Sequence, residues 1–464
     1  MAEKKKGAVS PLMQQLAGYI ATALRKPLPG PVTEKTKHHL LDTLAAMVSG
    51  STLPPGRMAI AYVKRLGDVT EATVAGSKVL TSAVHAALAN GMLAHADETD
   101  DSHAPAMMHP GCGIVSAALA MAERGRSNGV SLLRAVTLGY DIAARLNLSL
   151  HGPEFRVVGH LTHCIGPLFG STAAAAALAR LRPDQVRHAL SYAAQQASGV
   201  STYMRDTDHI EKAFDFGGMA ARNGVSAVTM VQAGCTGVDD VFSGERNFYV
   251  ANDETGRLGK PPRPEILVRG LGVDYEIMNT NIKRWSVGSP IQAPLDSMLE
   301  LIRTHKIRAE QVEKATIRVS QTGANTVDNR EMPDICMQHM CAVMLLDGIV
   351  TFESAHDEKR MSDPTVLAVR RRVELIGEEA LQKLLPQRQG IVELVLKDGR
   401  QLRHHTLAVR GTAQNPMTRP EVDEKGYHLM APVLGRKRAR ALCDSVWNIE
   451  RLKDVRKLRT LLQA

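Results

Sequence analysis

Small and aliphatic residues at helical spacing dominate the sequence up to about residue 265. Within LTSAVHAALANGMLAHA, apolar residues recur at every fourth position, on one face of a helix: Leu80, Val84, Leu88 and Met92. Two later stretches, FGSTAAAAALARL and VRHALSYAAQQASGV, continue this alanine-rich style. Aromatic residues make up only 4% of the chain, whereas apolar residues make up 44%. The pattern therefore favours closely packed helices over a β-sandwich.

The pattern changes at the breaker-rich segment GKPPRPE, near residue 260. KATIRVSQT alternates apolar and polar residues as a strand does, and IVELVLKDGRQLRHHTLAV indicates a hairpin that turns at Asp398–Gly399. The last 55 or so residues return to helical spacing. We therefore predict a mainly α protein. Residues 1–268 and 406–464 are expected to form a large all-helical domain, and residues 269–405 an inserted, smaller α+β domain.

The chain carries a formal net charge of +9, much of it near the C-terminus. Two interpretations are open: a basic face that binds nucleic acid or a membrane, and a cationic cleft for a small anionic substrate. The C-terminal stretch LGRKRARALCDSVWNIERL has the spacing of an amphipathic helix, for which a solvated basic face is the simpler explanation. Stacking aromatic residues are not interleaved with its basic residues, so binding of single-stranded nucleic acid is not expected.

The sequence lacks the usual motifs for nucleotide cofactors, zinc sites, membrane spans and signal peptides. The sequence has neither a G-x-G-x-x-G that opens a helix after a strand nor a G-x-x-x-x-G-K-[ST], so a nucleotide cofactor is not expected. The six cysteines show no zinc-site spacing, and a reduced, cytoplasmic setting is the simplest explanation of their pattern. No apolar run reaches the roughly 18 residues that a membrane span needs. The N-terminal MAEKKKGAVS lacks the apolar region of a signal peptide.

The segment HADETDDSHAPAMMHPG concentrates acids and histidines. It holds four acids framed by three histidines: Asp97, Glu98, Asp100 and Asp101, with His95, His103 and His109. Three interpretations compete: a metal site, an acid/base cluster in an enzyme cleft, and a solvated helix end followed by a loop. The acids follow a helix and so lie at the negative end of its dipole, which a cationic ligand or distant lysines would have to offset. Mutual repulsion would also raise the pKa of at least one acid, which suits a general acid.

Three further polar segments could carry chemistry. VVGHLTHCIGPLFG carries His160 and His163 before an alanine-rich helix. YMRDTDHIEKAFDFGG carries Lys212, and NIKRWSVGSP carries Lys283 and Arg284. For each segment, a structural histidine or a solvated charge is the alternative to a role in substrate binding.

These segments together resemble the MmgE/PrpD family, which includes 2-methylcitrate dehydratase and cis-aconitate decarboxylase. The resemblance rests on five blocks in the expected order: HADETDDSHAPAMMHPGCGIVSAALAMAE, GHLTHCIGPLFGSTAAAAALARL, EKAFDFGGMAARNG, NIKRWSVG and RGTAQNPMTRPEV. It implies a large helical domain made from both chain ends, a smaller α+β lid domain and a homodimer. It also implies a site without a metal or an organic cofactor, which acts on small di- or tricarboxylates.

The family pattern, similar to H-A-x-D-x-D-D-T-H followed by H-P, can be carried over position by position. The resemblance then implies these catalytic candidates: Glu98, the adjacent Asp97, Asp101, Ser102, His109, His160 and His339. The implied substrate-binding residues are Lys212, Lys283 and Arg284. The chain departs from the pattern with Glu98 for aspartate, Ser102 for threonine, His339 for tyrosine and Asp215 for histidine. These departures bear on the substrate more than on the reaction class.

The residues and the resemblance together predict a cofactor-independent lyase that removes a proton next to a carboxylate. Lysines can hold carboxylates as point charges, and a histidine can give or take a proton near neutral pH. The leading acid/base pair is Glu98 or Asp97 with His160, and His109 is close behind. Dehydration, decarboxylation and epimerisation remain open as reactions, with epimerisation as the runner-up. A basic, non-enzymatic binding protein is the alternative from another class; the main prediction includes no nucleic-acid or membrane partner.

Overall fold

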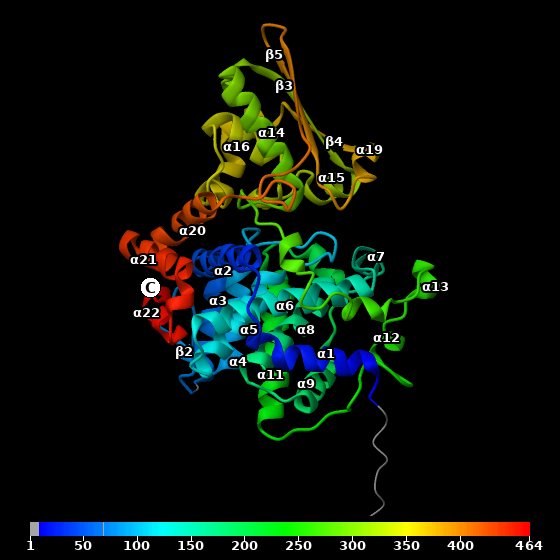
Figure 1. The fold of residues 1–464 in the computed structure, drawn as a ribbon. Coiled ribbons are helices and arrows are strands. Elements are labelled where there is room, and N and C mark those ends of the chain that lie inside the picture. Colours follow the sequence, from blue (N-terminus) through cyan, green and yellow to red (C-terminus); the bar gives the residue numbers. More distant parts are fainter. Residues whose placement is uncertain (1–8, 68) are drawn as a thin grey trace, which may run out of the picture. The chain divides into compact units, whose positions relative to one another are not determined.

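The chain folds mainly as α-helices, as the sequence predicts (Figure 1). The structure, a computed structural model, describes residues 9–67 and 69–464. Residues 1–8 of the segment in which we expect no signal peptide lie outside the described residues. No helix among the described residues is long and apolar enough to cross a bilayer. The six cysteines are free thiols.

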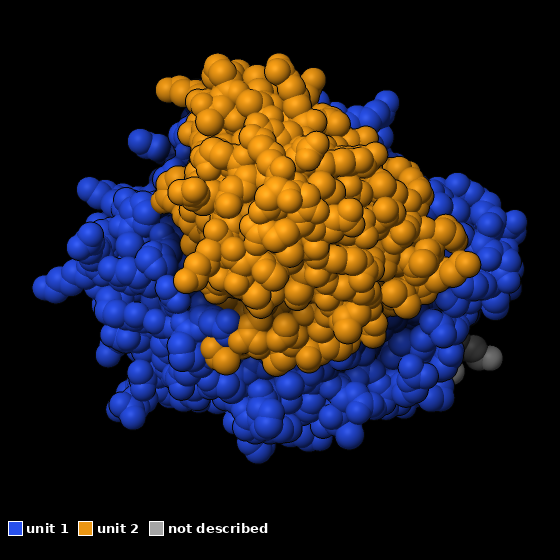
Figure 2. Space-filling view, turned by 90° about the horizontal axis from the view of Figure 1, so that it is seen from above, with its two compact units in different colours: residues 1–96, 100–280, 419–464 blue, residues 97–99, 281–418 orange. Residues whose placement is uncertain are grey.

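The described chain divides into two compact units, which Figure 2 colours separately. Unit 1 comprises residues 1–96, 100–280 and 419–464, and unit 2 comprises residues 97–99 and 281–418. The second unit thus extends from 281 to 418, whereas the sequence pattern placed the inserted domain at 269–405. The short acidic segment 97–99 belongs to unit 2, although the chain on both sides of it belongs to unit 1.

Unit 1 is a packed set of helices. Its longer helices are α1 (Pro11–Thr22), α2 (Gly30–Gly50), α3 (Pro54–Leu66), α4 (Ala83–Ala94), α5 (Pro110–Arg124), α6 (Gly129–Ser149), α8 (Thr162–Leu178), α9 (Pro183–Gln196), α11 (Met219–Gln232), α20 (Arg419–Leu434) and α21 (Arg436–Trp447). Its shorter elements are α7 (Gly152–Val157), α10 (Ile210–Ala213), α12 (Phe248–Ala251), α13 (Thr255–Leu258), α22 (Arg459–Leu462) and the strand pair β1 (Ala72–Thr73) and β2 (Leu80–Thr81).

Helix α8 is the buried centre of unit 1. All 17 of its residues are buried, and it contacts α5, α6 and α11. The alanine run 173–177 leaves little side-chain volume between α8 and these neighbours, so their axes can lie close together. Helix α20, in the C-terminal part of unit 1, packs on α2, where Lys425 Nζ donates to Asp42 Oδ1 at 2.6 Å. The two ends of the chain therefore share one core.

Unit 2 contains a four-stranded sheet with helices. The strands β3 (Val312–Ser320), β4 (Val373–Glu378), β5 (Gly390–Leu396) and β6 (Gln401–Thr406) lie in the order β4-β3-β5-β6. The β3–β4 pair is parallel and the other two pairs are antiparallel. The predicted hairpin is confirmed: β5 and β6 pair with Leu394 opposite Leu402, and Gly399 in the turn has φ +88°.

The helices of unit 2 complete its core. They are α14 (Ser289–His305), α15 (Gln321–Val327), α16 (Met337–Asp347), α17 (Phe352–Ala355), α18 (Pro364–Arg370) and α19 (Glu379–Gln382). Helix α14 contacts β5 and β6, and its Leu295 and Met298 are fully buried with Ile317 and Val392 of the sheet. Apolar burial of this kind is the main favourable term in the stability of such a unit.

A backbone contact between two glycines joins α4 to the π-helix Phe214–Gly218 (η3). A Cβ atom on Gly91 would lie 2.5 Å from the carbonyl carbon of Gly217, and a Cβ on Gly217 would collide with the Gly91 carbonyl oxygen. Only glycine permits this approach. The contact fixes the last turns of α4 against a segment that carries Phe216, which is why it matters for the site.

We predict that Gly91→Ala destabilises unit 1 by about 1–3 kcal/mol, the usual cost of forcing an extra methyl group into packed atoms. Gly256→Ala is the matched control, because a Cβ atom there would have nothing within 4 Å. Urea unfolding of the full chain measures both variants. Equal stability of the two variants would contradict the close packing of α4 on the π-helix.

Candidate active site

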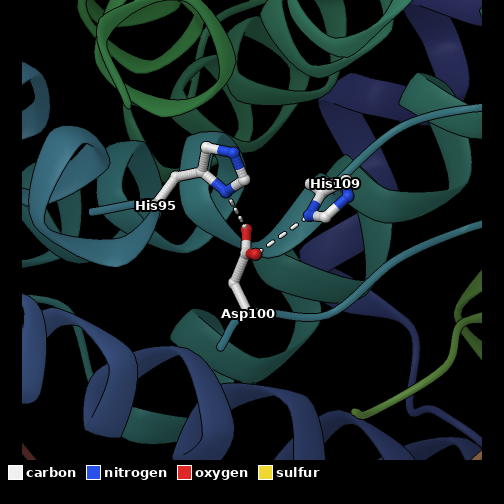
Figure 3. Close-up of side chains that lie close together, drawn as sticks. All are labelled: His95, Asp100 and His109. Atoms are coloured by element: carbon white, nitrogen blue, oxygen red, sulfur yellow. Dashed lines mark hydrogen bonds and ion pairs between the residues drawn. The ribbon is translucent and has the colours of Figure 1, made fainter. Parts of the chain in front are cut away.

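The buried carboxylate of Asp100 binds two histidines of unit 1 (Figure 3). His95 Nδ1 lies 3.0 Å from Asp100 Oδ2, and His109 Nδ1 lies 2.9 Å from Asp100 Oδ1. His95 follows the end of α4 and His109 precedes the start of α5, so the loop between these helices brings both rings to one carboxylate. Burial alone would raise the pKa of Asp100, but the charges and hydrogen bonds of the two histidines hold it well below its usual range.

The neighbouring Asp101 has its own set of donors. Its carboxylate accepts hydrogen bonds from Tyr140 Oη at 2.6 Å and from the Gly111 amide at 2.9 Å, and it binds His39 Nδ1 at 2.7 Å. Burial lowers the pKa of His39 to about 4, so this ring is neutral near pH 7. Asp101 is fully buried and ties α2, α5 and α6 to the loop after α4.

Phe216 is the centre of a cluster of rings in unit 1. His95 stacks on it with centroids 4.4 Å apart, and His163 stacks on it with centroids 4.0 Å apart. His109 meets the Phe216 ring edge-on at 5.5 Å, and Lys212 Nζ lies 5.4 Å from the ring centroid. The π-helix therefore brings a phenyl ring, three imidazoles and an ammonium group into one buried neighbourhood. π-helices of one turn are frequent at functional sites.

His163 is the histidine of its segment that joins this cluster. It is 5% exposed, and its Nδ1 atom is buried without a hydrogen-bond partner among the described residues. Burial, with the nearby His109 and Arg156, holds the pKa of His163 well below its usual range, so the ring is neutral. A neutral ring with an open nitrogen can bind a ligand group or take up a proton.

The structure places His160 outside this cluster. Its ring stacks on Phe155 with centroids 3.9 Å apart, and its Nε2 lies 2.6 Å from Glu254 Oε1. Sequence reasoning chose His160 over His163. The sequence did contain a signal that favours His163. An apolar helix starts at Thr162, and a histidine in the first turn of such a helix is buried with it.

Two other residues of the acidic loop shape it. His103 accepts a hydrogen bond from the Ala106 amide at Nδ1, and its Nε2 lies 3.2 Å from Glu276 Oε2. His103 and Met108 form an isolated β-bridge, which closes the turn directly before His109. Ser102 is half-buried next to it.

Unit 2 holds a second group of charged residues, centred on the segment 97–99. Lys283 is 3% exposed, and its Nζ donates to both the carbonyl and the carboxylate of Glu98 at 2.9 Å. Asp97 forms an ion pair with His356, whose Nε2 lies 3.0 Å from Asp97 Oδ2. Sequence reasoning missed His356, which lies far from Asp97 along the chain and in no recognised motif.

Both ring nitrogens of His356 face acceptors. Its Nδ1 donates to the carbonyl of Phe352 at 2.7 Å, and its Nε2 faces Asp97. Burial alone would lower the pKa of His356, but Asp97 and Asp334 raise it to about 9. The ring is therefore an imidazolium ion at neutral pH and holds Asp97 in place.

The two remaining predicted residues also belong to unit 2. His339 lies on α16, is fully buried, and has no hydrogen-bond partner at either ring nitrogen among the described residues. Burial, with Arg370 and Arg360, lowers the pKa of His339 to about 4. Arg284 is half-buried, lies over the Trp285 ring at 4.6 Å, and pairs with Asp296 at 3.5 Å.

The acids of the loop after α4 are crowded along the chain but are each given separate partners. We predicted that at least one of them keeps a proton through mutual repulsion; Asp100 is not that acid, because its two histidines favour the charged form. The structure indicates a different reason for the crowding. Asp97 and Glu98 bind cations of unit 2, whereas Asp100 and Asp101 bind histidines of unit 1.

One group of described side chains in unit 1 could surround a metal ion. The nearest ligand atoms of His95, Asp100 and His109 all lie within 4.8 Å of one another. The same atoms are separated by ordinary hydrogen-bond distances, so two N–H donors and a carboxylate explain the arrangement equally well.

Family models match both parts of the chain. The model of the MmgE/PrpD N-terminal domain matches residues 14–256, and the model of the MmgE/PrpD C-terminal domain matches residues 285–449.

Curated relatives match over nearly the whole length. The chain is 23% identical to the cis-aconitate decarboxylase-like protein oryM of Aspergillus oryzae, over 97% of this chain and 96% of that protein. It is 22% identical to a cis-aconitate decarboxylase of Aspergillus terreus, over 98% and 96%. It is 25% identical to the human cis-aconitate decarboxylase, over 93% of this chain and 90% of that protein.

We predict that His356 stabilises the protein in a pH-dependent way. Because its folded pKa of about 9 exceeds the ordinary value of 6.5, its contribution is complete below pH 6.5 and is lost as the pH rises through 9. The shift corresponds to roughly 3 kcal/mol at most. The difference in free energy of unfolding between the wild type and His356→Gln should therefore be large at pH 6 and small at pH 9.5.

The exposed His428 of α20 supplies the control, since His428→Gln should change stability little at either pH. A His356→Gln effect of the same size at both pH values would show that the ring stabilises by packing and not by its charge.

Proposed function

Because the chain belongs to the MmgE/PrpD family, we propose that it is a lyase of the dehydratase or decarboxylase kind, acting on a small di- or tricarboxylate. The observation that carries the proposal is the buried cluster around Phe216, where His109, His163 and Lys212 lie together. The names of the relatives support the decarboxylase kind and make cis-aconitate the first substrate to try.

The cluster has the groups that such a reaction requires. Loss of carbon dioxide or of a proton next to a carboxylate leaves an electron pair that spreads onto the remaining carboxylate oxygens. A positioned cation stabilises that charge, and a positioned base or acid moves the proton. We assign the cation to Lys212 and the proton transfer to His109 and His163.

In a decarboxylation, the bond between the carbon and its carboxylate breaks, and the electron pair stays on the carbon skeleton. A histidine that has first taken up a proton then donates it to that carbon. In a dehydration, a neutral histidine takes the proton from carbon, and an acid protonates the leaving hydroxyl group. Both sequences need a histidine that changes its proton within the buried site, and His109 keeps its ring against Asp100 for either role.

The unit 2 residues keep the roles that the resemblance implies. Glu98, or Asp97 beside it, is the acid, and Lys283 holds a carboxylate; His339 and Arg284 assist. Asp101 and Ser102 orient their neighbours. In place of His160, the histidine of the predicted acid/base pair, we assign His163, because His160 is engaged by Glu254.

Further features remain predictions of the resemblance: a homodimer, a lid role for the smaller unit, a cytoplasmic location, and a reaction without a cofactor. Epimerisation gains no support, since none of the relatives named above carries that activity in its name. No observation favours a non-enzymatic binding protein.

We predict that the protein releases carbon dioxide or water from one member of a panel of di- and tricarboxylates that includes cis-aconitate and 2-methylcitrate. Incubation in deuterated water, followed by proton NMR, separates the reactions. Deuterium uptake with loss of carbon dioxide indicates a decarboxylase, and loss of water indicates a dehydratase. Exchange without either loss would mean an epimerase, and no exchange with any acid would contradict the enzyme proposal.

We predict that Lys212→Ala lowers kcat/KM at least 10-fold, because the substrate anion loses a cation in a buried site. The melting temperature should change by less than about 2 °C, since Lys212 is only half-buried. Lys437→Ala, at an exposed position of α21, is the control and should keep full turnover. Unchanged turnover in Lys212→Ala would remove this lysine from the site.

A further inference from the structure

We infer that Asp100 is a positioning residue that fixes His95 and His109 in one tautomer, with the proton on Nδ1, and so leaves Nε2 of each ring as the acceptor. The role of His95 in this arrangement is to hold the second oxygen of the shared carboxylate. The inference rests on the proposed function for its kinetic consequence, but the tautomer itself can be measured without a substrate.

The chemistry of the two contacts determines where the protons lie. An ionised carboxylate has no hydrogen to donate, so a neutral imidazole that binds it must present an N–H group. Both contacts are made by Nδ1, at 3.0 Å for His95 and 2.9 Å for His109. Asp100 is 0% exposed, and a ring nitrogen within hydrogen-bond distance of each of its oxygens favours the ionised carboxylate. A neutral ring that carries its proton on Nδ1 has a bare Nε2.

His95 and His109 are coupled through the Asp100 carboxylate. The two rings bind opposite oxygens of one carboxylate, and their centroids lie 5.0 Å apart (Figure 3). A carboxylate held at one oxygen can rotate about its last bond, whereas one held at both oxygens cannot. His95 therefore fixes the plane of Asp100, and that plane sets the direction of the His109 ring.

The other ring nitrogen of His95 makes no hydrogen bond among the described residues. This atom is Nε2, and the ring that carries it is fully buried and stacked on Phe216. The open nitrogen is consistent with a ring kept for its Nδ1–H contact with Asp100.

Replacement of Asp100 by asparagine tests this arrangement sharply. The amide of Asn has one oxygen that accepts and one NH₂ group that donates, so it cannot accept an N–H from both histidines while they face opposite ends of the group. One ring must then turn its bare Nδ1 to the amide and carry its proton on Nε2, where it no longer accepts. In a serine protease, the analogous loss of the orienting aspartate lowers kcat by about 10⁴-fold.

The first test is nitrogen NMR of the full chain labelled with ¹⁵N-histidine, without any substrate. His95 and His109, assigned by His95→Gln and His109→Gln, should show a protonated Nδ1 and an unprotonated Nε2. In Asp100→Asn, one of the two rings should change to the opposite tautomer. Protons on Nε2 in the wild type would overturn the inference. A change of the Nδ1 signals when a chelator is added would also overturn it, because it would show a bound metal ion.

The second test is kinetic and uses the substrate found for the proposed function. Asp100→Asn should lower kcat by about 10²- to 10⁴-fold with KM nearly unchanged, whereas Asp184→Asn, exposed on α9, should leave both constants unchanged. A loss confined to KM would overturn the inference. Should no substrate be found, the proposed function fails, and the NMR result still decides the tautomer.

Two replacements of His95 separate positioning from packing. His95→Phe keeps an aromatic ring on Phe216 but removes the N–H group, and His95→Gln removes the ring but keeps an N–H donor. We expect His95→Gln to retain at least 10-fold more of the wild-type kcat than His95→Phe. The reverse order would show that the ring only fills space.

Discussion

The interaction on which the site depends is the binding of two histidines to the buried carboxylate of Asp100. A buried carboxylate without donors would be too costly to remain ionised, and two histidines without an acceptor would have no fixed tautomer. Their combination gives a charged, rigid centre inside a helical core. His109 belongs both to this centre and to the ring cluster around Phe216, so its orientation is set from two sides.

Close packing of the unit 1 helices allows this centre to be buried. The fully buried α8 delivers His163, and the glycine contact between α4 and the π-helix brings Phe216 to His95. Ordinary side chains at Gly91 or Gly217 would separate these segments. The small residues that first suggest close helix packing in the sequence are therefore the same ones that allow rings from distant segments to stack.

Much of the fold could be predicted because it depends on local patterns. The turn at Asp398–Gly399 and the spacing of Val84, Leu88 and Met92 each specify an element from neighbouring residues alone. The predicted helix face was wrong at Leu80, which lies on β2, because Ser82 caps α4 and the helix begins only at Ala83. The site was harder, because the role of a histidine depends on what faces it. His160 and His163 are three residues apart, yet one pairs with Glu254 and the other stacks on Phe216. The pairing of Asp97 with His356 joins segments that no local pattern relates.

The central claim is that the buried histidine cluster of unit 1 is where the substrate anion binds. Proton–carbon NMR of the histidine rings during titration with cis-aconitate or citrate tests it most directly. The account predicts saturable shifts of the His109 and His163 resonances, with His160 and His428 unchanged. Shifts confined to His160 or to exposed histidines, or no shift at millimolar acid, would contradict it.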